Sequence, residues 1–278
     1  MRCDNESSSN GHPPAASRRI VRLPVATVSE ADGVRYLHLG TPWVQGAMRI
    51  AEPGRLELEY VQRMMAWLLL RPAEALHRGH AVQLGLGAGS ITRYCLRTLR
   101  LRTTAVELNP SVIAACRAWF RLPSDSARLQ VLQMDAAAFA ADPARQASVD
   151  ALCVDLYDHE AASPVLDSAA FYGDCHALLA EGGTLAVNLF GHRSSFERSA
   201  RRIAQAFGAD RTWSLKPTKE GNTIVLALKS DTLAPRAELV ARAENIETRL
   251  ALPAGKWLRM LRPWSGSANE SVSHPSRA

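Results

Sequence analysis

The pattern of apolar and polar positions changes near residue 56. Between residues 20 and 50, short pieces of alternating character are interrupted by turn-forming residues, namely Pro24, Gly33, Gly40, Pro42 and Gly46. This spacing predicts two or three short antiparallel strands. The next stretch, "LELEYVQRMMAWLLL" at 56–70, carries apolar residues at helical spacing and stops before Pro72, which predicts a helix.

From residue 80 onward, short apolar runs alternate with longer segments of helical spacing. Strands are predicted at 81–85, 102–106, 129–132, 150–154, 184–189 and 223–228, and helices near 90–99, 110–119, 136–141, 168–180 and 194–207. Strands that alternate with helices of this length predict right-handed βαβ units. The expected fold is therefore α/β, with a doubly wound, mostly parallel sheet of about seven strands and a small N-terminal β lobe.

These patterns divide the chain into four segments. We expect an unstructured head at 1–18, the β lobe at 19–55, the main α/β domain at 56–250 and a tail at 251–278. The head and the end of the tail are polar and lack the apolar periodicity that a packed element needs.

Composition narrows the function. The 278 residues are 47% hydrophobic, enough to bury one sizeable core. The net charge of +6 comes from arginine, because the only lysines are Lys216, Lys219, Lys229 and Lys256. The arginines are scattered along the sequence, whereas a nucleic-acid binder typically concentrates them on one element together with aromatic residues. A nucleic-acid partner is therefore not expected.

The five cysteines lie far apart and include no Cys-x-x-Cys pair. This argues against a disulfide framework and a zinc site, so we expect no metal and a reducing compartment. The longest apolar run, "MMAWLLL" at 64–70, is far shorter than the about 20 residues of a membrane span. The N-terminus also lacks the apolar region of a secretory signal. These features favour a cytoplasmic protein without a membrane partner.

Candidate ligand-binding residues follow three successive strands. Gly85, Gly87 and Gly89 follow the first strand, Glu107 follows the second at 22 residues beyond Gly85, and Asp135 follows the third. In such sheets ligands bind outside the carboxyl ends of the strands. The glycines let the backbone approach a ligand, and a carboxylate can accept both ribose hydroxyls or the adenine amine. In this order the residues favour an adenosine site.

Each of these residues also has a purely structural interpretation. The glycines could simply close a tight turn between a strand and a helix, and Glu107 could be a solvated loop residue. Asp135 could be the N-cap of the following helix, a role that is compatible with ligand binding.

The fourth strand ends in a second group of polar residues. Asp155 and Asp158 lie on a loop with Tyr157 and His159, where two carboxylates could bind a cationic substrate or take a proton from an attacking amine. Alternatively, Asp155 supports the cofactor and Asp158 faces water. His159 has no partner at metal-ligand spacing and is interpreted as a solvated loop residue. Asn188 ends the fifth strand and is expected only to close the sheet edge.

The order of these residues resembles that of the spermidine synthase family, the polyamine aminopropyltransferases, over roughly residues 35–230. "YLHLGTPWVQGAMR" is similar to the family segment that contains a glutamine, here Gln45, and Tyr60 is similar to the tyrosine that borders the substrate pocket. "LGLGAGS", "AVELNPSVI" and "MDAAAF" resemble the glycine loop, the ribose-binding segment and the adenine-side aspartate. The run from Asp155 to Tyr172 resembles the gate loop.

The resemblance implies the Rossmann-like fold of class I S-adenosylmethionine methyltransferases, with residues 56–250 as the nucleoside-binding transferase domain. It also implies that decarboxylated S-adenosylmethionine gives its aminopropyl group to a small-molecule amine of the polyamine type, releasing methylthioadenosine. We expect a homodimer. The implied roles are catalysis by Asp155, acceptor binding by Asp158, Tyr60, Gln45 and Tyr157, and binding of the nucleoside by Gly85, Gly87, Gly89, Glu107 and Asp135.

Three departures from the family pattern affect the polyamine side. Ala88 stands where the glycine loop usually carries an aspartate, and Gln62 replaces a glutamate. The usual Pro and Gly after the second gate-loop aspartate are absent. Because Ala88 removes a carboxylate, a methyltransferase that uses intact S-adenosylmethionine is an alternative. A non-catalytic protein that binds only the nucleoside is another. Ser90 stands where a dinucleotide motif needs its third glycine, which favours an S-adenosyl compound over a dinucleotide.

Overall fold

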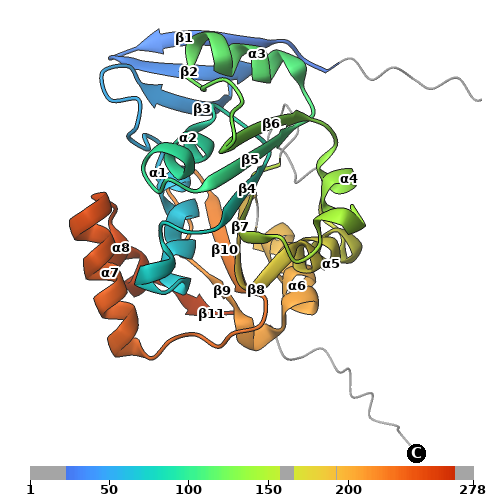
Figure 1. Ribbon diagram of the computed structural model, residues 1–278, viewed down its shortest axis with the longest axis vertical. Helices are drawn as coiled ribbons and strands as arrows, with labels where there is room; N and C mark the ends of the chain where they lie inside the picture. The colour runs from blue at the N-terminus through green and yellow to red at the C-terminus, as the bar shows by residue number, and fades with distance from the viewer. Residues whose placement is uncertain (1–22, 157–165, 192, 267–278) are drawn as a thin grey trace, which may run out of the picture.

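A small antiparallel sheet forms the N-terminal part of the molecule (Figure 1). The computed structural model describes residues 23–156, 166–191 and 193–266. The sheet has the order β1-β2-β3, with β1 (Ala26–Ala31), β2 (Val34–Leu39) and β3 (Val44–Arg49). The predicted β lobe is thus confirmed.

The second sheet has eight strands within the described residues, in the order β11-β9-β10-β8-β7-β4-β5-β6. Its parallel strands are β4 (His80–Leu84), β5 (Arg102–Glu107), β6 (Leu129–Gln133), β7 (Val149–Val154) and β8 (Leu179–Phe190). Its antiparallel edge consists of β9 (Thr212–Ser214), β10 (Asn222–Leu228) and β11 (Arg262–Pro263). The predicted α/β fold with a mostly parallel sheet is confirmed.

Helices cover both faces of this sheet (Figure 1). One face packs against α1 (Glu59–Met64), the 3₁₀-helix η1 (Met65–Leu70), α2 (Ser90–Arg97), α7 (Arg236–Leu250) and α8 (Ala254–Met260). The other packs against α4 (Ala136–Ala140), α5 (Ala169–Leu178) and α6 (Arg193–Phe207). Helix α3 (Pro110–Trp119) contacts β1, β5 and β6. Shorter 3₁₀ turns are η2 (Ala73–Ala75), η3 (Pro143–Arg145) and η4 (Ala209–Arg211).

Two elements differ from the prediction. The single helix expected over 56–70 is α1 followed by η1, and every residue of η1 is buried. This segment is apolar on all sides, so packing from several elements rather than one amphipathic face fixes its conformation. The domain boundary expected at 250 lies between α7 and α8, and Trp257 and Leu258 of α8 belong to the core. The packed chain therefore continues beyond residue 250.

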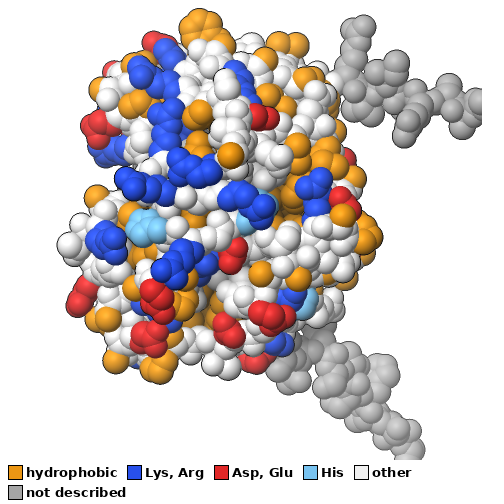
Figure 2. Space-filling view, in the orientation of Figure 1, with side chains coloured by type: hydrophobic (Ala, Val, Ile, Leu, Met, Phe, Trp, Pro, Cys, Tyr) orange, Lys and Arg blue, Asp and Glu red, His pale blue; other side chains and the backbone are white. Residues whose placement is uncertain are grey.

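Arginines that are distant in sequence meet in space. Figure 2 shows Lys and Arg side chains gathered in a run across one face of the molecule. Three exposed arginines lie at the amino ends of β4, β5 and β6, which are neighbours in the sheet. Arg78 lies two residues before β4, Arg102 is the first residue of β5, and Arg128 directly precedes β6. The scattered distribution read from the sequence thus becomes a basic edge at the amino ends of these strands.

The carboxyl ends of β4, β5 and β7 meet at the topological switch point of the sheet. The chain passes from β4 to β5 on one side, whereas β7 pairs with the other side of β4. The amide nitrogen of Gly85 donates to the carbonyl of Val106 at 2.9 Å, and that of Asp155 donates to the carbonyl of Leu84 at 2.9 Å. Ligands of open α/β sheets bind at such a point.

Candidate active site

The glycine loop joins β4 to α2 and packs directly against the end of β7. Gly85 has a φ of +85°, and a Cβ built on it would lie 2.1 Å from the carbonyl oxygen of Asp155. Both the left-handed conformation and the close approach require glycine. Gly87 and Gly89 also have positive φ values, of 50° and 69°. The structure therefore brings the glycine loop and Asp155 into contact.

Gln83 holds this loop from inside the sheet and was not singled out from the sequence. Its side chain is 3% exposed. Its Nε2 donates to the carbonyls of Gly85 at 2.7 Å and Leu86 at 3.2 Å. Its Oε1 accepts from the amide and hydroxyl of Thr92, at 3.0 and 2.6 Å. The sequence did contain a signal for Gln83, because it is a polar residue inside the apolar strand "HAVQL". A buried side-chain amide needs hydrogen-bond partners, so such a residue indicates a specific contact.

Glu107 connects the glycine loop to the start of α3. Its Oε2 accepts from the amide of Leu86 at 2.9 Å and its Oε1 from the amide of Asn109 at 2.8 Å. Burial raises the pKa of its carboxyl, although the backbone hydrogen bonds act in the opposite direction. Glu107 is thus half-buried and anchored, unlike a solvated loop residue. An ionised carboxylate has about four acceptor positions, which leaves capacity for a ligand.

Asp135 is the N-cap of α4. Its Oδ1 accepts from the amide of Ala138 at 2.9 Å, and the residue is exposed. This is the structural role that the sequence also suggested, and it is compatible with contact to an adenine. Its role toward a ligand remains a prediction.

Asp155 directly follows β7 and lies beside the glycine loop. Its Oδ1 accepts from Nδ2 of Asn188 at 2.9 Å, and the hydroxyl of Tyr60 also hydrogen-bonds to the carboxyl. Burial raises the pKa of Asp155 above its ordinary value, and the two hydrogen bonds oppose that shift. Two residues predicted for this site, Asp155 and Tyr60, are therefore in contact. The raised pKa makes the carboxylate a stronger base.

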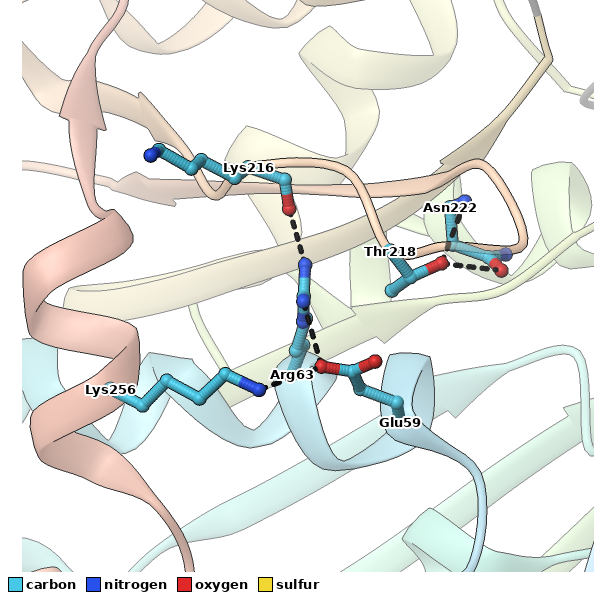
Figure 3. A network of polar contacts seen from close by, with 6 residues as sticks. All are labelled: Glu59, Arg63, Lys216, Thr218, Asn222 and Lys256. Atoms are coloured by element: carbon cyan, nitrogen blue, oxygen red, sulfur yellow. Dashed lines mark hydrogen bonds and ion pairs between the residues drawn. The ribbon is translucent and has the colours of Figure 1, made fainter.

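Asn188 belongs to a chain of polar side chains that extends away from Asp155. Asn222 of β10 donates through Nδ2 to Oδ1 of Asn188 at 3.1 Å. The hydroxyl of Thr218 lies 3.5 Å from Oδ1 of Asn222, and it accepts from the backbone amide of Asn222 at 3.2 Å (Figure 3). Asn188 thus does more than close the sheet edge. The sequence signal for this contact is an asparagine near one end of each of two buried strands, Asn188 in β8 and Asn222 in β10, which are neighbours in the sheet.

Helix α1 holds the loop that carries Thr218 (Figure 3). Arg63, 6% exposed, donates to the carbonyl of Lys216 and pairs with Glu59 at 2.7 Å. Lys256 of α8 contacts the same carboxylate at 3.1 Å. These cations hold the pKa of Glu59 below its ordinary value, with the hydrogen bond from Arg63 as the main cause. The helix that supplies Tyr60 therefore also fixes the loop behind Asn222.

Strand β3 of the small sheet lies against the glycine loop. A Cβ on Gly46 would be 2.6 Å from the Cβ of Ala88, and the hydroxyl of Ser90 donates to the carbonyl of Ala47 at 3.0 Å. The carbonyl oxygen of Gln45 lies 3.1 Å from the position of a Cβ on Gly87. Gln45 is half-buried, and its Nε2 has no hydrogen-bond partner within the described part of the chain. The structure thus places Gln45 beside the glycine loop.

A buried cation lies behind the same loop. Arg93 is 2% exposed and donates to the carbonyl of Ala88 at 2.5 Å and to the hydroxyl of Ser90 at 3.4 Å. Burial lowers its pKa to about 10. No ion pair joins Arg93 to a carboxylate of the residues that the structure describes.

Three predicted loop residues, Tyr157, Asp158 and His159, lie outside the described residues, and their roles stay predictions. The described parts of the chain contain no group of three or more His, Cys, Asp or Glu residues that could hold a metal ion. No described helix is long and apolar enough to cross a membrane.

Two curated proteins named polyamine aminopropyltransferase match most of the sequence. The one from Neisseria meningitidis is 32% identical over 233 residues, covering 81% of this chain and 86% of its own. The chain belongs to the polyamine aminopropyltransferase family. A second member, from Chromobacterium violaceum, is 30% identical over 242 residues, covering 86% of this chain and 90% of its own. The family predicted from the motifs is thus confirmed, and it is a family of transferases. No protein-family model matches the chain.

Solved structures with a similar fold include other aminopropyltransferases. A probable spermidine synthase from Corynebacterium glutamicum has a TM-score of 0.69 at 19% identity, covering 93% of this chain and 98% of its own. Human methyltransferase-like protein 13, in complex with SAH, has a TM-score of 0.57 at 21% identity, covering 76% of this chain and 97% of its own. These likenesses confirm the predicted Rossmann-like methyltransferase fold.

Proposed function

We propose that the protein transfers an aminopropyl group from decarboxylated S-adenosylmethionine to an amine of the polyamine type and releases methylthioadenosine. The contact between Gly85 and the backbone of Asp155 carries this proposal, because it joins a nucleoside-binding loop to a buried carboxylate. Membership of the aminopropyltransferase family supports it. One solved spermidine synthase structure of similar fold is a complex with the transition-state analogue AdoDATO.

In the donor half, the amides around Gly85, Gly87 and Gly89 approach the sulfonium nucleoside. Glu107 accepts the two ribose hydroxyls with the lone pairs that its backbone partners leave free. Asp135 accepts from the adenine amine while it caps α4. With the nucleoside held in this way, the carbon next to the sulfonium would lie on the side of Asp155.

In the acceptor half, Asp155 takes one proton from the incoming ammonium, because only a neutral nitrogen has the lone pair for attack. The lone pair forms the new N–C bond, the C–S bond breaks, and its electrons leave on the sulfur as a neutral thioether. Tyr60 orients the Asp155 carboxyl through its hydroxyl. Gln45, Tyr157 and Asp158 are proposed to contact the acceptor. We further propose that the protein is cytoplasmic and forms a homodimer. Light scattering on the purified protein measures its mass in solution and so tests the dimer.

The direct test combines calorimetry with product analysis. The protein is titrated with methylthioadenosine, S-adenosylmethionine and decarboxylated S-adenosylmethionine. It is then incubated with the decarboxylated donor and a diamine. Release of methylthioadenosine together with a lengthened polyamine is expected. Binding of the nucleosides without any transfer to a panel of amines would overturn the proposal.

One observation favours a second candidate function, a methyltransferase that uses intact S-adenosylmethionine. The glycine loop carries Ala88 in place of a carboxylate and is backed by the buried guanidinium of Arg93. This arrangement disfavours a donor with two positive charges and tolerates one that keeps its own carboxylate. Tighter binding of intact than of decarboxylated donor, with release of S-adenosylhomocysteine, would favour this candidate.

A further inference from the structure

The side chains behind Asp155 form a chain of donors that all point the same way. The hydroxyl of Thr218 faces Oδ1 of Asn222, Nδ2 of Asn222 donates to Oδ1 of Asn188, and Nδ2 of Asn188 donates to Oδ1 of Asp155. The three side chains are buried, at 6%, 9% and 4% exposure. Water therefore competes little for these groups, and each has to be satisfied by its neighbours.

The donor-to-acceptor direction of these hydrogen bonds is set at the end farthest from Asp155, by Thr218 and Asn222. A side-chain amide has an acceptor oxygen and a donor nitrogen, so it can face its neighbours in two ways. Because Asn222 presents its nitrogen to Oδ1 of Asn188, Asn188 must present its own nitrogen to Asp155. The reverse arrangement would turn an amide oxygen toward a carboxylate oxygen, which is repulsive.

We propose that Thr218, Asn222 and Asn188 are positioning residues that keep a hydrogen-bond donor on Oδ1 of Asp155 and thereby orient its carboxylate toward the amine. This inference rests on the proposed function of Asp155 as the base. None of the three residues needs to touch the substrate. Together they fix the rotation of the carboxylate, which matters because proton transfer depends on alignment.

The loop between β9 and β10 keeps the far end of this chain in place. The amide of Thr218 donates to the carbonyl of Asn222 at 2.8 Å, and that of Gly221 donates to the carbonyl of Thr218 at 3.2 Å. Arg63 of α1 donates to the carbonyl of Lys216 at the base of the same loop (Figure 3). Because α1 also supplies Tyr60, one helix supports both hydrogen bonds to Asp155.

This series of hydrogen-bonded side chains also affects the ionisation of Asp155. Among the described residues, the side chains that act on this carboxyl are Asn188 of β8 and Tyr60 of α1. Its charge in turn raises the pKa of the neighbouring Cys153 thiol of β7, and the backbone of Leu84 and Gly85 lies against the backbone of Asp155. Burial raises the pKa of Asp155, and donation by Asn188 lowers it. Loss or reversal of that donor therefore raises the pKa further.

The substitution Asn222→Asp tests the direction of the chain. A carboxylate at 222 only accepts, so the Asn188 amide is drawn to turn its nitrogen away from Asp155. The acid limb of kcat/KM should then move up by about one pH unit, a tenfold loss on that limb, with recovery at high pH and little change in KM. A role limited to stability would lower activity at all pH values without moving the limb.

Thr218 provides a matched pair of variants without a change in charge. Thr218→Val removes the hydroxyl that orients Asn222 and should move the acid limb in the same direction by a smaller amount. Thr218→Ser keeps the hydroxyl and should restore the wild-type limb. Circular dichroism confirms that each variant is folded. If folded Asn222→Asp and Thr218→Val both keep the wild-type acid limb, the proposal is wrong.

A spectroscopic measurement separates this inference from the proposed function. Carbon-13 NMR of aspartate-labelled protein follows the titration of the Asp155 carboxyl, with Asp155→Asn used to assign its signal. The pKa of Asp155 should rise in Asn222→Asp even if no aminopropyl transfer occurs. Absence of transfer with this shift present would overturn only the proposed function. An unchanged Asp155 titration would overturn the positioning role alone.

Discussion

The proposed donor half and the proposed acceptor half of the site are fixed by different kinds of contact. In the donor half, the glycine loop is held by backbone groups, which Gln83 and Glu107 bind from two sides. In the acceptor half, Asp155 is held by the side chains of Tyr60 and Asn188, which come from separate elements. In the first arrangement side chains bind backbone groups of the loop, whereas in the second they bind another side chain.

This difference predicts that a substitution in one half leaves the other half largely unchanged. Because the loop is held through its backbone groups, we expect substitutions in the proposed acceptor half to leave its shape unchanged. A carboxylate oriented by side chains changes its direction and pKa with a single substitution. The following experiments test whether the two halves respond separately.

The largest effect is expected from Asp155→Asn. This change removes the proposed base and should lower turnover by about a hundredfold or more. Affinity for methylthioadenosine should stay within about twofold, because the amide keeps the shape of the side chain. Steady-state release of methylthioadenosine and calorimetry measure the two quantities. Full turnover in the variant would show that Asp155 is not the base.

Glu107→Ala should have the converse effect. Loss of charge-assisted hydrogen bonds to the ribose should weaken methylthioadenosine binding by about ten- to a hundredfold. Turnover at saturating donor should fall much less. Because Glu107 also accepts from Leu86 and Asn109, Glu107→Gln serves as a control that keeps the size of the side chain. Unchanged affinity in a folded Glu107→Ala protein would place this residue outside the nucleoside site.

Gln83→Leu tests whether backbone support of the glycine loop is required. The substitution keeps the approximate volume but leaves the carbonyl of Gly85 and the amide of Thr92 without their side-chain partner. The free energy of unfolding should fall by about 1–3 kcal/mol, and nucleoside affinity should fall several-fold. Urea denaturation and calorimetry provide both values. A loss of stability with wild-type affinity would limit Gln83 to a role in the core.

The smallest effect is expected from Asp158→Asn, a prediction from the sequence alone. The loss of one negative charge should raise KM for a cationic acceptor by about three- to tenfold, with a smaller loss of turnover. Nucleoside affinity should not change. The comparison of KM for a diamine and for a monoamine provides the control, and equal KM values in variant and wild type would exclude a contact with the acceptor.

The sequence predicted the parallel sheet well because its strands and helices have strong, distinct periodicity. The helix from Pro110 to Trp119 begins and ends where expected. The apolar segment Met65–Leu70 was expected to continue a helix and is a 3₁₀-helix, because packing on every side overrides its local preference. Strands β9 and β11, with three and two residues, are too short to show a pattern.

In the site, the sequence identified residues that directly follow strands and missed those that support them. Glu107 and Asp155 stand at the carboxyl ends of β5 and β7, where a rule of topology points to them. Gln83, Asn188 and Asn222 lie within strands, and their importance depends on which strands are neighbours and which face they share. A single sequence does not supply that pairing, since β8 and β10 are separated by more than thirty residues.

The contact between β3 and the glycine loop has a consequence for the order of folding. The buried residues of the small sheet, including Leu37 and Met48, pack on Leu86, Phe120 and Leu129 rather than on one another alone. During synthesis the small sheet leaves the ribosome before these partners, and the set of its apolar contacts is complete only after the chain has grown past residue 129. The three strands of the small sheet are therefore expected to pack stably only when the main sheet has formed. The close approach of Gly46 to Ala88 is therefore expected to form only once these elements can pack together.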